Sequence, residues 1–95
     1  MKILAIENEY EGKSSDDFKP YLKDEAMTVW GLYKENFIRE IYFRKDKTSA
    51  VLMLECESVE EAEKTLAELP LVKGKLIYFE IIPLVAYPGF ERLFK

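Results

Sequence analysis

The sequence predicts an α+β domain of the ferredoxin-like class, with the element order βαββαβ and one antiparallel sheet of four strands. Three observations predict it. The chain has 95 residues, enough for a single domain, 1–95, built on one core. Hydrophobic residues make up 48% of it and aromatic residues 14%, which is typical of a packed globule. Strand-like and helix-like patterns then follow one another in that order, with one tight hairpin at the centre.

The first half of the chain predicts a strand, a helix and a second strand. Residues 2–7 are rich in Ile, Leu and Ala, as in a buried strand, and a polar loop follows at 8–15. The next segment predicts a helix that ends near Asn36, a residue that tolerates the left-handed conformation. The stripe expected to be buried on that helix comprises Leu22, Ala26, Val29, Trp30 and Tyr33. Residues 37–44, rich in Ile, Tyr and Phe, predict the second strand.

The second half predicts a hairpin, a helix and a last strand. A charged turn at 45–48 joins the second strand to a third strand at 49–57. A capping box starting at Ser58 begins the second helix, since Ser and Glu three residues apart satisfy the first free N–H groups. Pro70 is expected to end that helix, and residues 76–82 form the fourth strand. The segments therefore complete the βαββαβ order.

Both faces of the predicted sheet are apolar. Strict alternation in the second strand places four residues on one face: Phe37, Arg39, Ile41 and Phe43. Helices can cover only one face, so we expect a homodimer that pairs two sheets, with possible further assembly. The apolar tail, 83–95, would be costly to leave in water, and we expect it to pack on its own domain or on the partner subunit.

Composition excludes several classes of partner. The net charge is −4 and no cluster of Lys or Arg is visible, which argues against nucleic acid. Residues 50–54 of the third strand also lack the aromatic side chains that stack on RNA bases. No apolar stretch approaches a membrane span, and the N-terminal apolar run is too short for a secretion signal. With a lone Cys56 and no histidine, we expect a cytoplasmic protein without a disulfide or a metal site.

Two groups of residues resemble those of the muconolactone isomerase-like family. The first comprises Leu22-Lys23-Asp24-Glu25-Ala26, Trp30, Leu32-Tyr33 and Ile38-Arg39-Glu40-Ile41-Tyr42. The second comprises Ser58-Val59-Glu60-Glu61-Ala62, Thr65-Leu66, Leu69-Pro70-Leu71, Pro83-Leu84 and Tyr87-Pro88. The resemblance covers most of the chain in the expected order. The chain departs from the family pattern in having no histidine near the hairpin, where it has Lys47-Thr48.

This resemblance implies a dimeric α/β barrel made of two ferredoxin-like protomers, sheet to sheet. It also implies a cofactor-free isomerase that moves a proton on a small unsaturated lactone or carboxylate. The alternative is a non-catalytic module of the same fold that binds a small anionic or aromatic molecule or serves mainly to oligomerise. The absence of histidine favours the alternative, and the match of motifs favours the isomerase.

Glu25 and Arg39 are the candidate catalytic residues. Glu25 borders the apolar stripe of the first helix, where a partly desolvated carboxylate has a raised pKa and can shuttle a proton. Arg39 alternates with apolar residues, and its guanidinium can hold a substrate carboxylate. The competing interpretations are a surface pair for Glu25 and an interface salt bridge for Arg39.

Four further residues are candidates for ligand binding. Trp30, Tyr33 and Tyr42 can line a pocket for a flat molecule, although aromatic residues at helical spacing are more often core. Lys23 can hold an anion at the pocket mouth, although a solvated lysine is the simpler interpretation. No metal ligand is predicted.

Overall fold

The computed structural model describes residues 1–95 as a four-stranded antiparallel sheet with helices on one side. The strands are β1 (Lys2–Glu9), β2 (Ile38–Phe43), β3 (Ala50–Glu55) and β4 (Ile77–Leu84), in the spatial order β2-β3-β1-β4. The helices are α1 (Ser15–Phe18), α2 (Leu22–Lys34), α3 (Val59–Leu66) and α4 (Pro70–Lys73), with 3₁₀ turns η1 (Lys19–Tyr21) and η2 (Gly89–Phe94). The predicted ferredoxin-like βαββαβ fold is confirmed.

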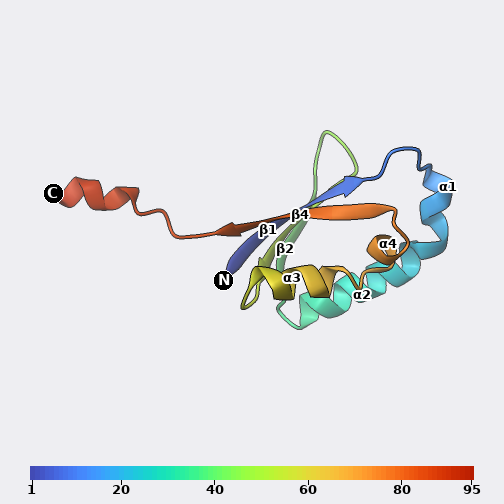
Figure 1. Ribbon diagram of the computed structural model, residues 1–95, viewed down its shortest axis with the longest axis horizontal. Coiled ribbons are helices and arrows are strands. Elements are labelled where there is room, and N and C mark those ends of the chain that lie inside the picture. The colour runs from blue at the N-terminus through green and yellow to red at the C-terminus, as the bar shows by residue number, and fades with distance from the viewer.

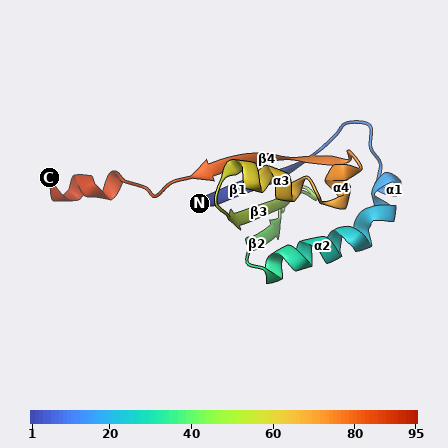
Figure 2. The ribbon, with the colours of Figure 1, turned by 60° about the horizontal axis from the view of Figure 1, so that its bottom comes forward.

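The core lies between the helices and the face of the sheet that they cover, which we call the helix face. Figures 1 and 2 show α2, α3 and α4 together on this side. The fully buried side chains are contributed by all four strands, by α3 and by the segment after it: Ile3, Ile38, Leu52, Leu54, Leu66, Leu69 and Ile77. Alternation within each strand therefore delivers one residue in two to this core.

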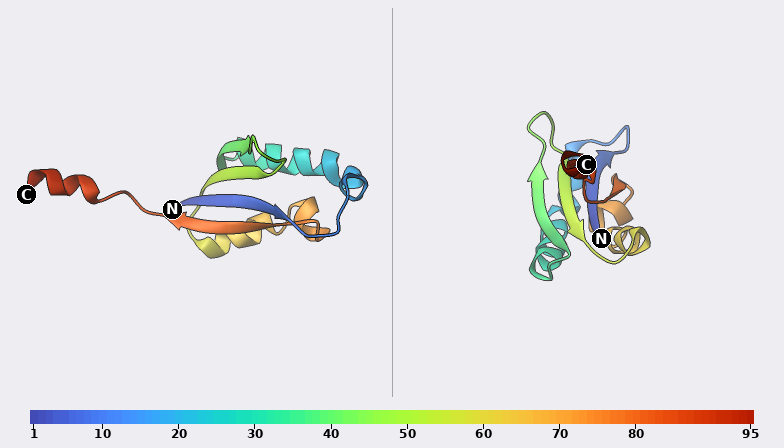
Figure 3. Two further views of the ribbon diagram at one scale, coloured as in Figure 1. Left: turned by 90° about the horizontal axis from the view of Figure 1, so that it is seen from above. Right: turned by 90° about the vertical axis from the view of Figure 1, so that its left-hand side faces the viewer.

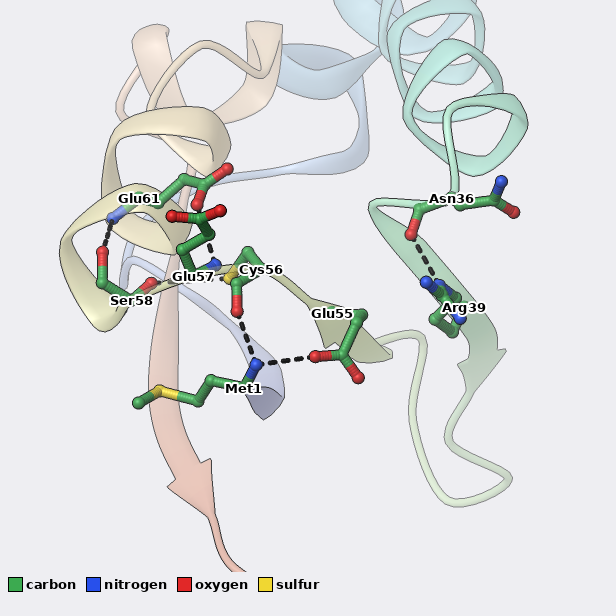
Figure 4. A network of polar contacts seen from close by, with 8 residues as sticks. All are labelled: Met1, Asn36, Arg39, Glu55, Cys56, Glu57, Ser58 and Glu61. Carbon is green, nitrogen blue, oxygen red and sulfur yellow. Dashed lines mark hydrogen bonds and ion pairs between the residues drawn. The ribbon is translucent and has the colours of Figure 1, made fainter.

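The residues predicted to end or cap helices mostly do so in the structure. Asn36 adopts a φ of 66° and ends α2, and its backbone carbonyl accepts a hydrogen bond of 2.7 Å from Nε of Arg39 (Figure 4). Ser58 caps α3, with its Oγ accepting from the N–H of Glu61 at 3.1 Å. The Glu61 carboxylate, however, accepts from the N–H of Glu57 rather than from that of Ser58, so the predicted capping box is only half formed.

Two element boundaries differ from the prediction. Pro70 does not merely end the second helix: α3 stops at Leu66, and Pro70 is the first residue of the separate helix α4. Proline suits a first helical position because its missing N–H would have no partner there. β4 also continues past residue 82 as far as Leu84, because Pro83 pairs with Ile3 on an edge strand that leaves its other side free.

A β-bulge in β2 overturns the strict alternation expected for that strand. Ile38 pairs with Leu54, but the next pair is Glu40 with Met53, so Arg39 is an extra residue. Ile41 then pairs with Leu52, which puts Ile38 and Ile41 on the same, helix-covered face. Strict alternation predicts that Arg39 shares a face with Ile41 and Phe43. Because of the bulge, it does not.

The other face of the sheet, which we call the open face, carries no covering element in the protomer (Figure 3). Its apolar residues are Leu4, Ile6, Val51, Met53, Ile82 and Leu84, flanked by Tyr42 and Tyr78. These first six side chains are half-buried, and both tyrosines are exposed. An apolar surface of this kind is typical of an interface.

The C-terminal tail extends away from the domain. Figures 1 and 3 show residues after Leu84 leaving the end of β4 and finishing in η2, well beyond the sheet. Its apolar side chains are exposed, with Val85 93% and Phe94 85% accessible. Within the tail, the rings of Tyr87 and Phe90 contact edge to face, with centroids 5.0 Å apart. Within the protomer this segment therefore extends away from the rest of the domain.

Candidate functional site

A partly open cavity of about 280 Å³ lies between the helix face of the sheet and α2. Its walls come from β1, β2, β3, the hairpin loop, the α1–α2 region and α4. Its apolar lining comprises Phe18, Leu22, Ala26, Val29, Ile41, Phe43, Ala50 and Leu71. The bulge in β2 matters here, because it turns both Ile41 and Phe43 toward α2. Three carboxylates and Thr48 complete the lining.

Glu25 is placed in this cavity by α2. One of its carboxylate oxygens, Oε1, accepts a hydrogen bond of 3.0 Å from the N–H of Leu71 in α4. Burial raises the pKa of Glu25, and the Leu71 hydrogen bond opposes that rise only in part. The prediction that this carboxylate borders the buried face of the helix is consistent with this position.

Glu7 is a second carboxylate in the same cavity, and the sequence reasoning missed it. It lies on β1, where it is only 8% exposed, and its Oε1 accepts a hydrogen bond of 3.1 Å from the N–H of Ala50. Burial raises its pKa, and the nearby charges of Glu9 and Glu25 raise it further. A signal was present in the sequence: Glu7 continues the period-two series of Ile3 and Ala5, whose side chains enter the core.

The raised pKa values of Glu7 and Glu25 make a prediction about stability. A carboxyl group whose pKa is higher in the folded state favours folding below its unfolded pKa, and that contribution is lost as the pH rises through the folded pKa. We therefore expect the wild type to lose stability, relative to Glu7→Gln, as the pH rises from 4.5. Thermal melts of both proteins between about pH 4 and pH 8 measure this difference.

The control for this prediction is Glu63→Gln, a change of the same kind on an exposed position of α3. It is expected to follow the wild type at every pH. A Glu7→Gln protein that kept the wild-type pH dependence would contradict the prediction.

A second hollow brings together four of the predicted site residues. It is an open groove of about 480 Å³ between α2 and the edge strand β2, lined by Trp30, Tyr33, Arg39 and Tyr42 among others. The Trp30 and Tyr33 rings stack with centroids 6.0 Å apart, and both are exposed, Trp30 by 58%. The expected burial of the stripe on this helix is thus wrong, because α2 lies over the edge of the sheet and contains no buried residue.

The structure does not bring Glu25 and Arg39 to one cavity. Glu25 faces the cavity on the helix face, whereas Arg39 lines the groove and donates its Nε hydrogen to the carbonyl of Asn36 (Figure 4). Ala26, Val29 and Ile41 contribute to both hollows and separate them. Lys23 is exposed and lines neither hollow. Arg39 forms no ion pair with Glu55 or Glu80 in the protomer, which leaves its guanidinium available.

The structure contains neither a cluster of metal-binding side chains nor a membrane-spanning helix. No group of three or more His, Cys, Asp or Glu side chains is placed to hold a metal ion. None of the helices has the length and apolar character needed to cross a bilayer. Burial raises the pKa of the Cys56 thiol, which disfavours the nucleophilic thiolate form.

Fold and cavity together define a ferredoxin-like α+β protein with an acidic, apolar-walled cavity under its sheet. The solved structures that share this fold include two enzymes. One is muconolactone isomerase, with a TM-score of 0.73 and 18% identity over 94% of this chain and 93% of that chain. The other is 5-chloro-2-hydroxyhydroquinone dehydrochlorinase (TftG) from Burkholderia phenoliruptrix AC1100, in complex with 2,5-dihydroxybenzoquinone. Its TM-score is 0.67, at 17% identity over 94% of this chain and 98% of that chain.

The likeness to both proteins extends over nearly the whole of each chain, so it concerns the complete fold. The resemblance noted in the sequence is confirmed at that level. No family model matches the sequence, and no curated protein matches it in a sequence search. At these identities the comparisons show the fold, and the chemistry has to be argued from the cavity.

Proposed function

We propose that the protein is a cofactor-free isomerase that moves a proton on a small unsaturated lactone or carboxylate. The observation that carries this proposal is the Glu25 carboxylate, held by the N–H of Leu71 in an apolar cavity that raises its pKa. A general base works best when its pKa lies near the working pH, and burial moves a glutamate in that direction. The cavity volume of about 280 Å³ is close to the lower end of typical ligand pockets, which suits a small substrate.

The proposed reaction needs only one proton carrier. Ionised Glu25 removes a proton from the carbon between the carbonyl group and the double bond, and that C–H electron pair forms a dienolate. The protonated Glu25 then returns the proton to the far end of the dienolate, where a new C–H bond forms. The double bond moves, no atom is gained or lost, and no oxidant or reductant is required.

The two proteins of the same fold support this choice of chemistry. Muconolactone isomerase is named for an isomerisation, and the dehydrochlorinase for the removal of hydrogen chloride. Removal of hydrogen chloride takes a proton from the substrate, and the isomerisation that we propose for this chain also moves one. The dehydrochlorinase structure also contains a small six-membered ring compound, 2,5-dihydroxybenzoquinone. We therefore favour a small unsaturated cyclic compound as the substrate of this chain.

The proposal includes a homodimer that pairs the open faces of two protomers. The apolar residues of that face, among them Leu4, Met53 and Ile82, are only half-buried in the protomer. A closed two-fold arrangement would remove them from water and would place the C-terminal tail against the partner. A cytoplasmic location is part of the same proposal, because the buried Cys56 has no disulfide partner.

Glu25→Gln is the experiment that tests the proposed reaction. The substituted amide keeps an oxygen to accept from the N–H of Leu71 but cannot take up a proton. With α-angelica lactone, a neutral unsaturated lactone, we expect the wild type to shift the double bond and Glu25→Gln to be slower by at least about 100-fold. Ultraviolet absorbance of the conjugated product measures the rate.

Glu63→Gln is the matched control, since it removes an exposed carboxylate outside both hollows, and its rate should equal that of the wild type. Equal rates for Glu25→Gln and the wild type would rule out Glu25 as the proton carrier.

A second candidate function is non-catalytic binding of a flat, anionic molecule in the groove between α2 and β2. The stacked, exposed rings of Trp30 and Tyr33 and the unpaired Arg39 favour it. Quenching of Trp30 fluorescence by an aromatic carboxylate such as salicylate measures binding there. Arg39→Gln is expected to weaken that binding about tenfold, whereas Lys23→Gln, outside the groove, should leave it unchanged.

A further inference from the structure

We infer that Glu7 is a second catalytic residue of the proposed isomerase, and that its cavity takes an uncharged carbonyl compound, such as a lactone, rather than a carboxylate. This inference rests on the proposed function and deepens it. Two observations carry it: the arrangement of two carboxylates in one cavity, and the absence of any cationic side chain from the cavity wall.

The first observation is the geometry of the two carboxylates. Glu7 comes from β1 and Glu25 from α2, and both line the cavity of about 280 Å³. Each has its Oε1 held by one backbone N–H, that of Ala50 for Glu7 and that of Leu71 for Glu25. The other oxygen, Oε2, has no hydrogen-bond partner in the protein in either Glu7 or Glu25. Both Oε2 atoms are accessible from outside the protein. One oxygen of each carboxyl group is thus fixed, and the other is free to serve a ligand.

The second observation is the charge of the cavity wall. Glu7, Glu9 and Glu25 all line it, and no lysine or arginine does. Arg39 lines the adjoining groove between α2 and β2 and does not line the cavity. An anionic substrate would meet like charges without a cation to hold it, which costs binding free energy. A neutral lactone avoids this repulsion and brings a carbonyl oxygen that can accept a hydrogen bond.

The charged and titratable groups around Glu7 decide which carboxyl group keeps a proton. Glu9 on the same strand and Glu25 on α2 are negative and favour protonation of Glu7. Lys47 and Tyr78 line an adjoining hollow with Glu7, but Lys47 forms no ion pair with it. Burial raises the pKa of Glu25 as well, and the hydrogen bond from the N–H of Leu71 lowers it. Two carboxyl groups in one cavity disfavour each other's ionisation, and we assign the retained proton to Glu7 because its side chain is the more buried of the two.

This asymmetry gives each carboxyl group a role. Glu7, as the neutral acid, donates its O–H to the carbonyl oxygen of the lactone. Glu25, as the carboxylate, removes the proton from the adjacent carbon, and negative charge develops on the oxygen that Glu7 contacts. When Glu25 returns the proton to the far carbon, the carbonyl group re-forms and Glu7 keeps its own proton. The roles balance without any further reactant.

The test compares 4-carboxymethylbut-3-en-4-olide, a lactone with a CH₂ group between its carbonyl group and its double bond, with the methyl ester of the same compound, so that the two substrates share one ring and differ in charge. For the wild type we expect kcat/KM to favour the ester by at least about tenfold. Glu7→Gln is expected to lower kcat for the ester by about 10- to 100-fold with little change in KM, because the lost interaction acts on the developing charge. It should also remove the alkaline limb of the pH–rate profile, which reports ionisation of Glu7.

A second measurement reports on Glu7 without turnover. In protein carrying ¹³C-labelled glutamate, the side-chain carboxyl signal of Glu7 is followed as the pH is raised. We expect it to titrate at lower pH in Glu25→Gln than in the wild type, because the neighbouring negative charge is gone. Glu63→Gln should leave the Glu7 titration unchanged.

The outcomes separate this inference from the proposed function. Loss of turnover in Glu25→Gln, together with wild-type kcat and pH profile in Glu7→Gln, would overturn the role of Glu7 and leave the isomerase standing. Preference for the carboxymethyl lactone over its methyl ester would overturn the substrate class. Wild-type turnover in Glu25→Gln would overturn the proposed function itself, and the inference with it.

Discussion

Met53→Glu is expected to convert a dimeric protein into a monomer. Met53 lies on β3, one of the two central strands, where it pairs with Leu4 and with Glu40 on the open face. If two protomers pair these faces, the substitution buries an unpaired carboxylate twice in one interface, since two-fold symmetry repeats it. The expected increase in the dimer dissociation constant is at least about 1000-fold.

Sedimentation velocity over a range of protein concentrations measures this change. Met27→Glu is the matched control, because it makes the same substitution on the exposed side of α2, away from the open face. It should sediment as the wild type does. A wild-type protein that sediments as a monomer, or a Met53→Glu protein that stays dimeric, would refute pairing through this face.

Leu54→Ala is expected to cost about 3 kcal/mol of the free energy of unfolding. Leu54 is fully buried at the centre of the helix face, where its neighbours across the sheet are Ile3 and Ile38. Removing its outer carbons loses their transfer free energy and leaves a cavity that the sheet backbone cannot close.

Urea unfolding at one fixed protein concentration measures the effect, since any dimerisation makes stability depend on concentration. Val85→Ala is the control, because Val85 is 93% exposed in the tail, and a change below about 0.5 kcal/mol is expected. A loss of similar size in both variants would mean that the tail is packed in the assembled protein.

The order of the elements was predictable because it depends on local signals. The period-two pattern of Ile3 and Ala5, the capping serine Ser58 and the left-handed Asn36 each act over a few residues, and each has its expected effect. These signals are enough to define a βαββαβ order, and a chain of this size has few ways to arrange it.

The site was only partly predictable because it depends on contacts between distant segments. Glu25 could be placed at the border of a helix stripe, but its partner Glu7 reaches the same cavity only through the packing of α2 on the sheet. The exposure of Trp30 and Tyr33 follows from the position of α2 over an edge strand, which periodicity does not report. Arg39 was assigned to the wrong neighbours because an alternating pattern cannot show where a strand carries an extra residue.

The bulge at Arg39 also affects how this chain can be compared with its relatives. A homologue whose second strand lacks the extra residue would match it residue for residue either before or after this position, but not on both sides. Counting across the strand without a gap would then exchange Ile41, which lines the cavity, for Tyr42, which lies on the open face. An alignment that opens a single-residue gap at Arg39 pairs each side chain with one in the same environment. Only with that gap can substitutions at the cavity positions of β2 be compared between homologues.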